Sequence, residues 1–370
     1  MKQKLEDIAV VTMGQSPKGD TYNSIGNGMP FLQGNRTFGD RYPTFDTWTT
    51  SPTKIAEAGD VIMSVRAPVG ALNITPIKMC LGRGVCSIRA KNGCQDYIYY
   101  LMKYSMEQLL SKESGTVFGS VNRNDINGLE VDVPETVEAQ ERIARFLAAI
   151  DDKIETNKQI NDNLLQQTLT LYKSRFIDLK PFNGEMPEDW HLGTVSEIIE
   201  IHDSKRIPLS NRERAELDKI YPYYGATSIM DYVDRYLFDG IYLLLGEDGT
   251  VVDSKGFPIL QYVEGKFWVN NHAHILTGKN GFSVEMLYLF FSLTNVREIV
   301  TGAVQPKISQ GRLNSLDTIV PDEKTAKTFD EIIQPIFAQI RAIHDENQCL
   351  TTLRDTLLPK LMSGEIDVEN

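Results

Sequence analysis

The sequence contains one pattern twice, about 187 positions apart, and each copy leads into a long stretch with heptad spacing of apolar residues. The first copy covers residues 117–134 and the second covers residues 304–321. Their apolar positions coincide, Leu129 aligns with Leu316, and both copies close on a proline. A repeat of this length is typical of a chain built from two units of one design. We therefore predict two similar domains, each followed by a long helix.

The first heptad stretch, residues 136–180, contains neither glycine nor proline. Its apolar pattern predicts a single helix of about 40 residues, roughly 60 Å long. Asn157 occupies a heptad position, where a buried polar residue often fixes the register of helix pairing. The predicted seam comprises Ile143, Ile150, Asn157, Leu164 and Leu171, with Phe146 and Ile160 beside it.

The second heptad stretch begins after Pro321. Pro335 should kink its first turns, whereas Pro359 and Gly364 should mark its fraying end. Neither helix is stable in water with such a stripe exposed, so we expect the two to pack together as a coiled coil. The pairing must be antiparallel if the two domains lie at opposite ends. The predicted seam of the second helix is Phe329, Ile336, Ile343, Leu350 and Leu357.

The remaining sequence is typical of mixed α/β (α+β) domains, because short strand-like runs alternate with clusters of Gly, Pro, Asn and Asp. Strands are predicted at 60–66, 84–89 and 241–245, and helices at 97–110 and 284–293. The predicted fold is thus two α/β copies related by a pseudo-two-fold internal repeat and joined by two long helices. The predicted boundaries are 1–134 for the first domain, 135–180 for the first long helix, 181–321 for the second domain, and 322–370 for the second long helix and C-terminal tail.

Composition limits the class of protein. No apolar run approaches the ~18 residues needed to cross a bilayer, and the first residues lack the apolar core of a signal peptide, so we expect a cytoplasmic protein without membrane contact. The net charge of −12 argues at first against nucleic-acid binding, but residues 1–134 carry +1 and residues 181–321 carry −7. A local basic face can therefore coexist with an acidic total.

The four cysteines (Cys80, Cys86, Cys94 and Cys349) lack the spacing of a zinc site. We expect these cysteines to be small buried apolar residues.

Signals of catalysis are missing from the sequence. It contains no phosphate-binding loop, no dinucleotide-binding turn, and no glycine-rich loop or tetrapeptide of an adenine methyltransferase. The pairs Asp253/Lys255 and Glu264/Lys266 have the spacing of metal nucleases, but we interpret them as chance. His272 and His274 form at most half of a metal site, and a structural role is favoured. We predict no catalytic residue and no metal site.

Two similar but diverged surfaces at the ends of a rod suit a target made of two unlike halves. DNA repeats its groove every ~34 Å, so a rod of fixed length would select a fixed spacing. Bases are read by Arg or Lys at guanine and by Asn or Gln at adenine. Such residues in the predicted loops are Gln33, Asn35, Arg36, Arg66, Arg83, Asn122 and Arg123 in the first domain, and Lys205, Arg206, Asn270, Asn271, Gln305 and Lys307 in the second.

Several motifs carry a resemblance to a known family. The first unit closes with Gly115-Thr-Val-Phe, Leu129, Val133-Pro134 and Glu138-Ala-Gln140, and the second with Gly302-Ala-Val-Gln-Pro-Lys-Ile308, Leu316 and Val320-Pro321. With the ending Leu353-Arg-Asp-Thr-Leu-Leu-Pro-Lys-Leu-Met-Ser-Gly-Glu-Ile366, the chain resembles the specificity subunits of type I restriction-modification systems. One departure is that Thr325-Ala-Lys327 replaces the Glu-Ala-Gln of the first copy.

The resemblance implies that each domain is a target recognition domain that reads half of an asymmetric, interrupted DNA sequence. It also implies partners: double-stranded DNA, two modification (methyltransferase) subunits, and restriction/translocase subunits in the full complex. This chain would be non-catalytic and would hold no cofactor. S-adenosylmethionine, ATP and Mg would belong to the partner subunits.

Two alternatives remain open at this point. In the first, the chain is a coiled-coil adaptor or scaffold that does not bind DNA, which would also explain the acidity and the absent active site. In the second, it is a nuclease that uses the Asp/Glu-x-Lys pairs. Steep loss of DNA affinity with salt would distinguish a DNA reader from an adaptor.

Overall fold

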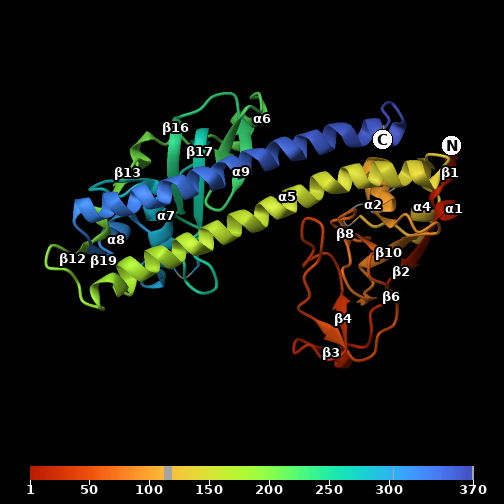
Figure 1. Cartoon of the computed structure of the whole chain (residues 1–370), viewed down its shortest axis with the longest axis horizontal. Helices are drawn as coiled ribbons and strands as arrows, with labels where there is room; N and C mark the ends of the chain where they lie inside the picture. Colours follow the sequence, from red (N-terminus) through yellow and green to blue (C-terminus); the bar gives the residue numbers. More distant parts are fainter. Residues whose placement is uncertain (112–118, 303, 369–370) are drawn as a thin grey trace. The chain divides into compact units, whose positions relative to one another are not determined.

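The computed structural model describes residues 1–111, 119–302 and 304–368, shown in Figure 1. The motif residues 115–118 lie outside this description. The chain forms two compact units: unit 1 combines Met1–Thr156 with Glu346–Asn370, and unit 2 comprises Asn157–Asp345. The division falls inside both long helices, so each unit holds one α/β core and a segment of each helix.

The described residues of unit 1 form three antiparallel or mixed sheets. Their strand orders are β1-β11, β2-β10-β7-β8 and β3-β5-β4-β9-β6. Helix α2 packs in one core with the second sheet, α4 and the first turns of the first long helix. The strands are β1 (Lys2–Lys4), β2 (Ala9–Met13), β3 (Tyr22–Asn23), β4 (Met29–Leu32), β5 (Trp48–Thr49), β6 (Ile55–Ala56), β7 (Val61–Ser64), β8 (Leu72–Ile74), β9 (Met79–Leu81), β10 (Val85–Ala90) and β11 (Glu130–Asp132). The short helices are α1 (Leu5–Ile8), η1 (Gly19–Thr21), α2 (Gln95–Tyr104), α3 (Met106–Leu110) and α4 (Arg123–Asn127).

Unit 2 contains a two-stranded sheet, β12-β19, and a six-stranded sheet of order β13-β18-β16-β17-β14-β15. Helix α7 packs against the large sheet in the core of this unit. The strands are β12 (His191–Thr194), β13 (Ile199–Ile201), β14 (Tyr221–Tyr224), β15 (Ile229–Val233), β16 (Phe238–Gly246), β17 (Leu260–Val269), β18 (Ala273–Gly278) and β19 (Asp317–Val320). The short helices are η3 (Lys180–Phe182), η4 (Val195–Glu197), η5 (Asp203–Lys205), α6 (Asn211–Ala215), α7 (Val284–Leu293), η6 (Arg297–Ile299) and α8 (Gln310–Asn314).

The same backbone hydrogen bonds recur in both units, which confirms the internal repeat. In each unit a residue after the first strand donates to the leucine before the last strand, and the central strands meet in the same register. The bonds therefore match residues of the two units one by one. Matching pairs are Leu5 N to Leu129 O and Val195 N to Leu316 O, Lys91 N to Ile8 O and Lys279 N to Ile198 O, and Val121 N to Val65 O and Ile308 N to Glu247 O.

The two long helices are present. Helix α5 (Val137–Tyr172) has 36 residues and passes into a π-helical turn, η2 (Lys173–Ile177), whereas α9 (Glu323–Ser363) has 41 residues. Helix α9 runs through both of its prolines and ends just before Gly364, which has a φ of 74°. The sequence correctly predicted Gly364 as the end, but Pro359 lies inside the helix. None of the helices in the described ranges has the length and apolar character that crossing a bilayer requires.

In unit 1 the helices are antiparallel and joined by buried charge. Arg354 of α9 donates to Asp151 of α5 at 2.7 Å, and the Tyr100 hydroxyl donates to the same carboxylate at 2.7 Å. Asn347 lies opposite Ile154, whose carbonyl oxygen accepts from its side chain. Burial of Asp151 opposes its ionisation, but hydrogen bonds from Arg354 and Tyr100 hold the pKa of the carboxyl below its ordinary value.

In unit 2 the same two helices are again antiparallel. The Asn161 amide donates to the carbonyl of Ile340 at 3.1 Å, and the rings of Tyr172 and Phe329 lie 5.8 Å apart. Rising residue numbers on α5 thus meet falling numbers on α9 within this unit, as they do within unit 1. The predicted antiparallel pairing is confirmed in each unit.

The strict heptad seam is wrong in its second half. Ile143, Ile150 and Asn157 are buried, but Leu171 is 45% exposed and Tyr172 is buried in its place. After Asn157 the next fully buried residue is Thr168, so the buried stripe advances by 11 positions instead of seven. The stripe follows the 3.6-residue turn of the helix, which drifts from a seven-residue repeat. Phe146 and Ile160 are also exposed. The other predicted seam residues are Phe329, which is buried, and Leu164, Ile336, Ile343, Leu350 and Leu357, which are half-buried.

We expect Asp151→Asn to lower the free energy of unfolding by about 3 kcal/mol, because it removes the buried carboxylate that pairs with the half-buried Arg354. Asp355→Asn is the matched control, since Asp355 also contacts Arg354 but is exposed, and should cost less than about 1 kcal/mol. Chemical denaturation of the two variants checks this. Equal losses would contradict a special role for the buried pair.

Candidate nucleic-acid interface

Two residues of unit 1 that were predicted to contact DNA, Gln33 and Arg83, lie close together beside Ser16. The Ser16 hydroxyl donates to the side-chain oxygen of Gln33 at 2.8 Å and accepts from the backbone N–H of Arg83 at 3.2 Å. Both Gln33 and Arg83 are exposed. The two loops therefore carry an amide and a guanidinium group. These groups form hydrogen bonds with the edges of adenine and guanine, respectively.

The other predicted residues of unit 1 divide into free and engaged side chains. Arg36 is exposed and forms a bidentate contact with Asp46, and Arg66 is exposed next to its backbone bridge with Ser120. Asn35 is half-buried. Asn122 caps α4 by accepting from the backbone N–H groups of Asn124 and Asp125, and Arg123 donates to the carbonyl of Val11 at 2.8 Å. Asn122 and Arg123 thus hold the fold of their own loop.

In unit 2 the predicted residues divide in the same way. Lys205, Asn271, Gln305 and Lys307 are exposed. Asn270 is 4% exposed, because its amide donates to the sulfur of Met230 and accepts from the His272 N–H. A base contact by Asn270 would require the loop to rearrange, and its predicted contact with DNA stays a prediction.

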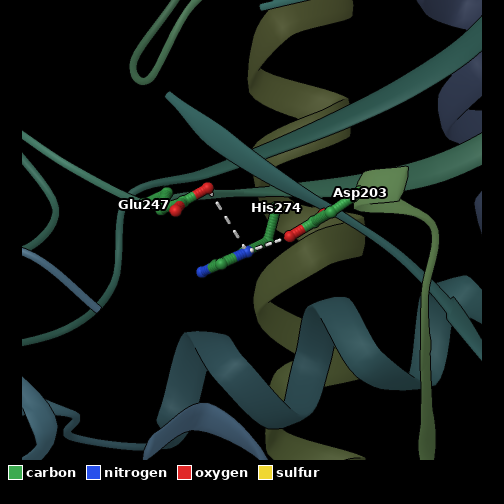
Figure 2. A group of neighbouring side chains, drawn as sticks. All are labelled: Asp203, Glu247 and His274. Carbon is green, nitrogen blue, oxygen red and sulfur yellow. Dashed lines mark hydrogen bonds and ion pairs between the residues drawn. The ribbon is translucent and has the colours of Figure 1, made fainter. Parts of the chain in front are cut away.

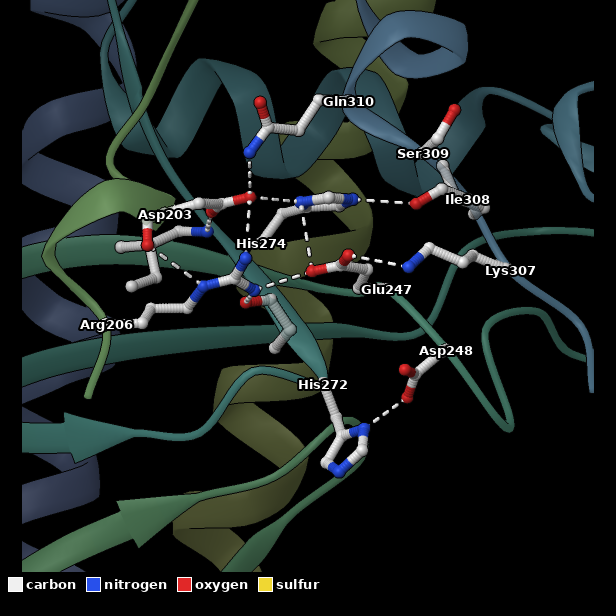
Figure 3. A network of polar contacts seen from close by, with 12 residues as sticks. Asp203, Arg206, Glu247, Asp248, His272, His274, Lys307, Ile308, Ser309 and Gln310 are labelled. Atoms are coloured by element: carbon white, nitrogen blue, oxygen red, sulfur yellow. Dashed lines mark hydrogen bonds and ion pairs between the residues drawn. The ribbon is translucent and has the colours of Figure 1, made fainter. Parts of the chain in front are cut away.

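Arg206 lies within a cluster of charged side chains that sequence reasoning missed. Figure 2 shows Asp203, Glu247 and His274 converging from three separate segments. The His274 Nδ1 atom lies 2.6 Å from Asp203 Oδ2 and 3.8 Å from Glu247 Oε2. Arg206 bridges the two carboxylates, at 2.6 Å from Glu247 and 3.3 Å from Asp203, as Figure 3 shows. We call these four residues the charge cluster.

Further hydrogen bonds and an ion pair hold the charge cluster in place. The second ring nitrogen of His274 lies 2.8 Å from the carbonyl oxygen of Ile308, so both nitrogens face oxygen acceptors. Gln310 donates to Asp203 at 2.6 Å, and Lys307 lies 3.1 Å from Glu247. Each ring nitrogen of His274 thus has an oxygen atom within hydrogen-bond distance. His274 and Asp203 are buried, and such groups are tolerated inside a protein when they are paired in this way.

Both carboxyl groups of the charge cluster, Asp203 and Glu247, have a pKa below the ordinary value. Burial of Asp203 raises its pKa, but hydrogen bonds from His274, the Ile275 N–H and Gln310 outweigh burial and bring the pKa below its ordinary value of 3.8. Burial likewise raises the pKa of Glu247, but Arg206, His274 and Lys307 bring it below 4.5. The cluster is therefore a set of ion pairs at neutral pH.

The ligand atoms of Asp203, Glu247 and His274 lie within 4.8 Å of one another, a spacing that metal sites also have. The donor set is already used, because Arg206 and Lys307 neutralise the carboxylates and both nitrogens of His274 are engaged. A divalent cation would have to displace these partners, so the residues fit an ionic network better than a metal centre. His272 takes no part, since its ring contacts Asp248.

Other sequence predictions have clear outcomes. Cys80, Cys86 and Cys94 are buried as expected, whereas Cys349 is exposed on α9. Asp253 accepts the backbone N–H groups of Lys255 and Phe257, which makes its pairing with Lys255 part of a turn.

A family model supplies the decisive comparison. The model described as "Type I restriction modification DNA specificity domain" matches residues 1–166 and again residues 187–352. The chain belongs to this family. Its members are the specificity subunits of type I restriction-modification systems, which recognise the DNA target and are not catalytic.

Individual relatives agree with the family. The chain is 24% identical to the type I restriction enzyme MjaIX specificity subunit of Methanocaldococcus jannaschii, over 99% of this chain and 93% of that protein. It is 36% identical to a protein of the same organism named for the MjaX specificity subunit, over 42% of this chain and only 36% of that protein. The crystal structure of a type I S subunit from M. genitalium matches 100% of this chain and 96% of its own, with 18% identity and a TM-score of 0.59, which shows the shared fold.

We expect acid to remove the contribution of the charge cluster to stability. Carboxyls whose folded pKa is lowered stabilise the fold above their unfolded pKa, and this contribution is lost as the pH falls through the folded value. The difference in free energy of unfolding between the wild-type chain and Asp203→Asn should therefore shrink from neutral pH to below about pH 4.

Chemical denaturation of both proteins across this pH range checks the expectation. Asp239→Asn, at an exposed position on β16, is the control and should not differ from the wild-type chain. A pH-independent difference for Asp203→Asn would contradict the ion pairing.

Proposed function

We propose that the chain reads a bipartite, asymmetric DNA sequence, with one half-site for each domain. The observation that carries the proposal is that the two units share a backbone hydrogen-bond frame but carry different side chains on matching loops. Arg66 of unit 1 matches Asp248 of unit 2, and Ser120 matches Lys307, because each pair forms the same backbone bridge. Equal frames with unequal side chains suit two half-sites of unlike sequence.

The side chains with exposed polar ends are the best candidates for contact with bases or phosphates. In the first domain these are Gln33, Arg36, Arg66 and Arg83, with Asn35 partly accessible. In the second they are Lys205, Asn271, Gln305 and Lys307. Asn122, Arg123, Arg206 and Asn270 would instead support the loops, through a helix cap, bonds to backbone carbonyls, buried carboxylates and a methionine sulfur. Arg36 and Lys307 would exchange their ion pairs with Asp46 and Glu247 for contacts with DNA.

We propose further that the paired helices set the spacing between the half-sites. A helix of the length of α5 extends about 54 Å, which is more than one groove repeat of ~34 Å. The boundaries proposed for this arrangement are 1–134 and 181–321 for the recognition domains, and 135–180 and 322–370 for the helical spacers. The buried Asn157 and the 11-residue step after it would fix the register.

The proposed partners follow from the family. Two modification subunits would dock on this chain and restriction/translocase subunits would complete the complex in the cytoplasm. The chain itself would hold no cofactor, and S-adenosylmethionine, ATP and Mg would be bound by the partner subunits. Sharing the DNA with these subunits would also accommodate the net charge of −12.

Selection from a random duplex library, with the cognate modification subunit bound, tests the proposal. We expect an enriched sequence of two unlike half-sites separated by a fixed gap, and affinity that falls steeply with rising salt. Absence of enrichment with the modification subunit demonstrably bound would contradict the proposal and favour the adaptor alternative.

Inserting one heptad next to Asn157, with a matching heptad in α9, should lengthen the preferred gap and leave both half-sites unchanged. The inserted turns add about 10 Å to the spacer, or roughly three base pairs of duplex. The same selection experiment on the insertion variant measures the new gap. An unchanged gap in a folded, assembled variant would rule out the helices as the ruler.

A further inference from the structure

Three members of the charge cluster, Asp203, Glu247 and His274, occupy positions that are apolar in unit 1. Val121 N donates to Val65 O as Ile308 N donates to Glu247 O, so Glu247 stands where the first unit has Val65. Cys86 pairs with Met63 between the central strands of unit 1, and His274 pairs with Leu245 in the same way in unit 2.

The third member follows from the neighbouring strand. Val11 pairs with Ile88, and Ile201 pairs with Leu276, so Asp203 stands where the first unit has Met13. Met13, Val65 and Cys86 all belong to the apolar core of unit 1. Unit 2 thus replaces three apolar side chains with two carboxylates and an imidazole.

An apolar core is the less costly way to fill such a position, because burial of ions carries a desolvation penalty that pairing only offsets. The contacts of the charge cluster indicate what is gained. Glu247 contacts Lys307 with its side chain and Ile308 with its backbone, and His274 contacts the carbonyl of Ile308. Asp203 accepts from Gln310. All these bonds converge on one short stretch, 307–310.

This stretch forms the base of an exposed segment, residues 304–307. Thr301 and Lys307 exchange both backbone hydrogen bonds, at 2.8 and 2.7 Å, and Gly249 N donates to the carbonyl of Pro306. Val304 is 99% exposed at the tip, and Gln305 and Lys307 are exposed beside it. The segment, closed by these hydrogen bonds, therefore presents an apolar group, an amide and an amine to solvent. Proteins use such groups to contact nucleotide bases and phosphates.

We infer that segment 304–307 is a reading element for the second half-site and that Glu247 is the positioning residue that holds it, through Lys307 and the charge cluster. The inference rests on the proposed function. Unit 1 lacks a counterpart of this support at Met13, Val65 and Cys86, so loss of Glu247 affects one half-site only.

The test uses the full chain with its modification subunit and the Glu247→Gln variant, which keeps the side-chain shape but removes the charge. The probes are the duplex enriched in the selection experiment and two versions with one half-site scrambled. The variant should bind the second half-site about tenfold more weakly and the first with unchanged affinity. Glu200→Gln, at an exposed position on β13 of the same unit, is the matched control and should bind both like the wild-type chain.

A second readout does not depend on DNA. Amide hydrogen exchange at 304–308 should be faster in Glu247→Gln and in Lys307→Gln, because each variant removes the same ion pair. The two variants should also be non-additive in second-half-site binding. If Glu247→Gln fails to fold, Lys307→Gln alone decides through its exchange at 304–308.

Wild-type affinity for the second half-site, equal losses at both half-sites, or unchanged exchange at 304–308 would overturn the inference. These results are distinct from failure of the proposed function, in which the wild-type complex itself enriches no sequence.

Discussion

The pairing of the apolar stripes of α5 and α9 is the interaction on which the rest of the structure depends. Each helix contributes residues to the core of both units, so neither core is complete without a segment of each helix. The stripes are too long to remain in water, and each covers the other. Both cores therefore need segments that lie far apart in the sequence.

Buried charge fixes how each core holds its helix segments. In unit 1, Arg354 of α9 donates to Asp151, which also accepts from the Tyr100 hydroxyl. In unit 2, Arg341 of α9 meets Tyr262 at 2.7 Å and the buried Glu285 at 3.0 Å. Apolar packing alone tolerates small slips along a helix, whereas an arginine that must reach one buried carboxylate does not. The two arginines thus define the register in which α9 docks.

The sequence predicted the fold well where periodicity is strong. The helix at 284–293 has the predicted bounds, the central strands lie within a few residues of their predicted places, and both long helices are present. The prediction failed where contacts with other parts of the fold determine the local structure. The predicted helix 97–110 divides at Ser105 into α2 and α3, and Leu171 turns outward because the buried stripe follows the true helical repeat. Gln33 and Arg83 are exposed and Asn270 is buried, a difference that the residue type does not reveal, because it does not show whether an amide is already bonded.

The sequence by itself determined the duplication, the two long helices and the family, because these depend on spacing along the chain. Only the tertiary structure decided which side chains are engaged and which are free. Asp203, Glu247 and His274 lie 27 to 71 positions apart and share no motif, so nothing in their spacing reveals that they meet. Their meeting follows from strand pairing, which places β18 beside β13 and β16 and so brings three separated charges into one buried network.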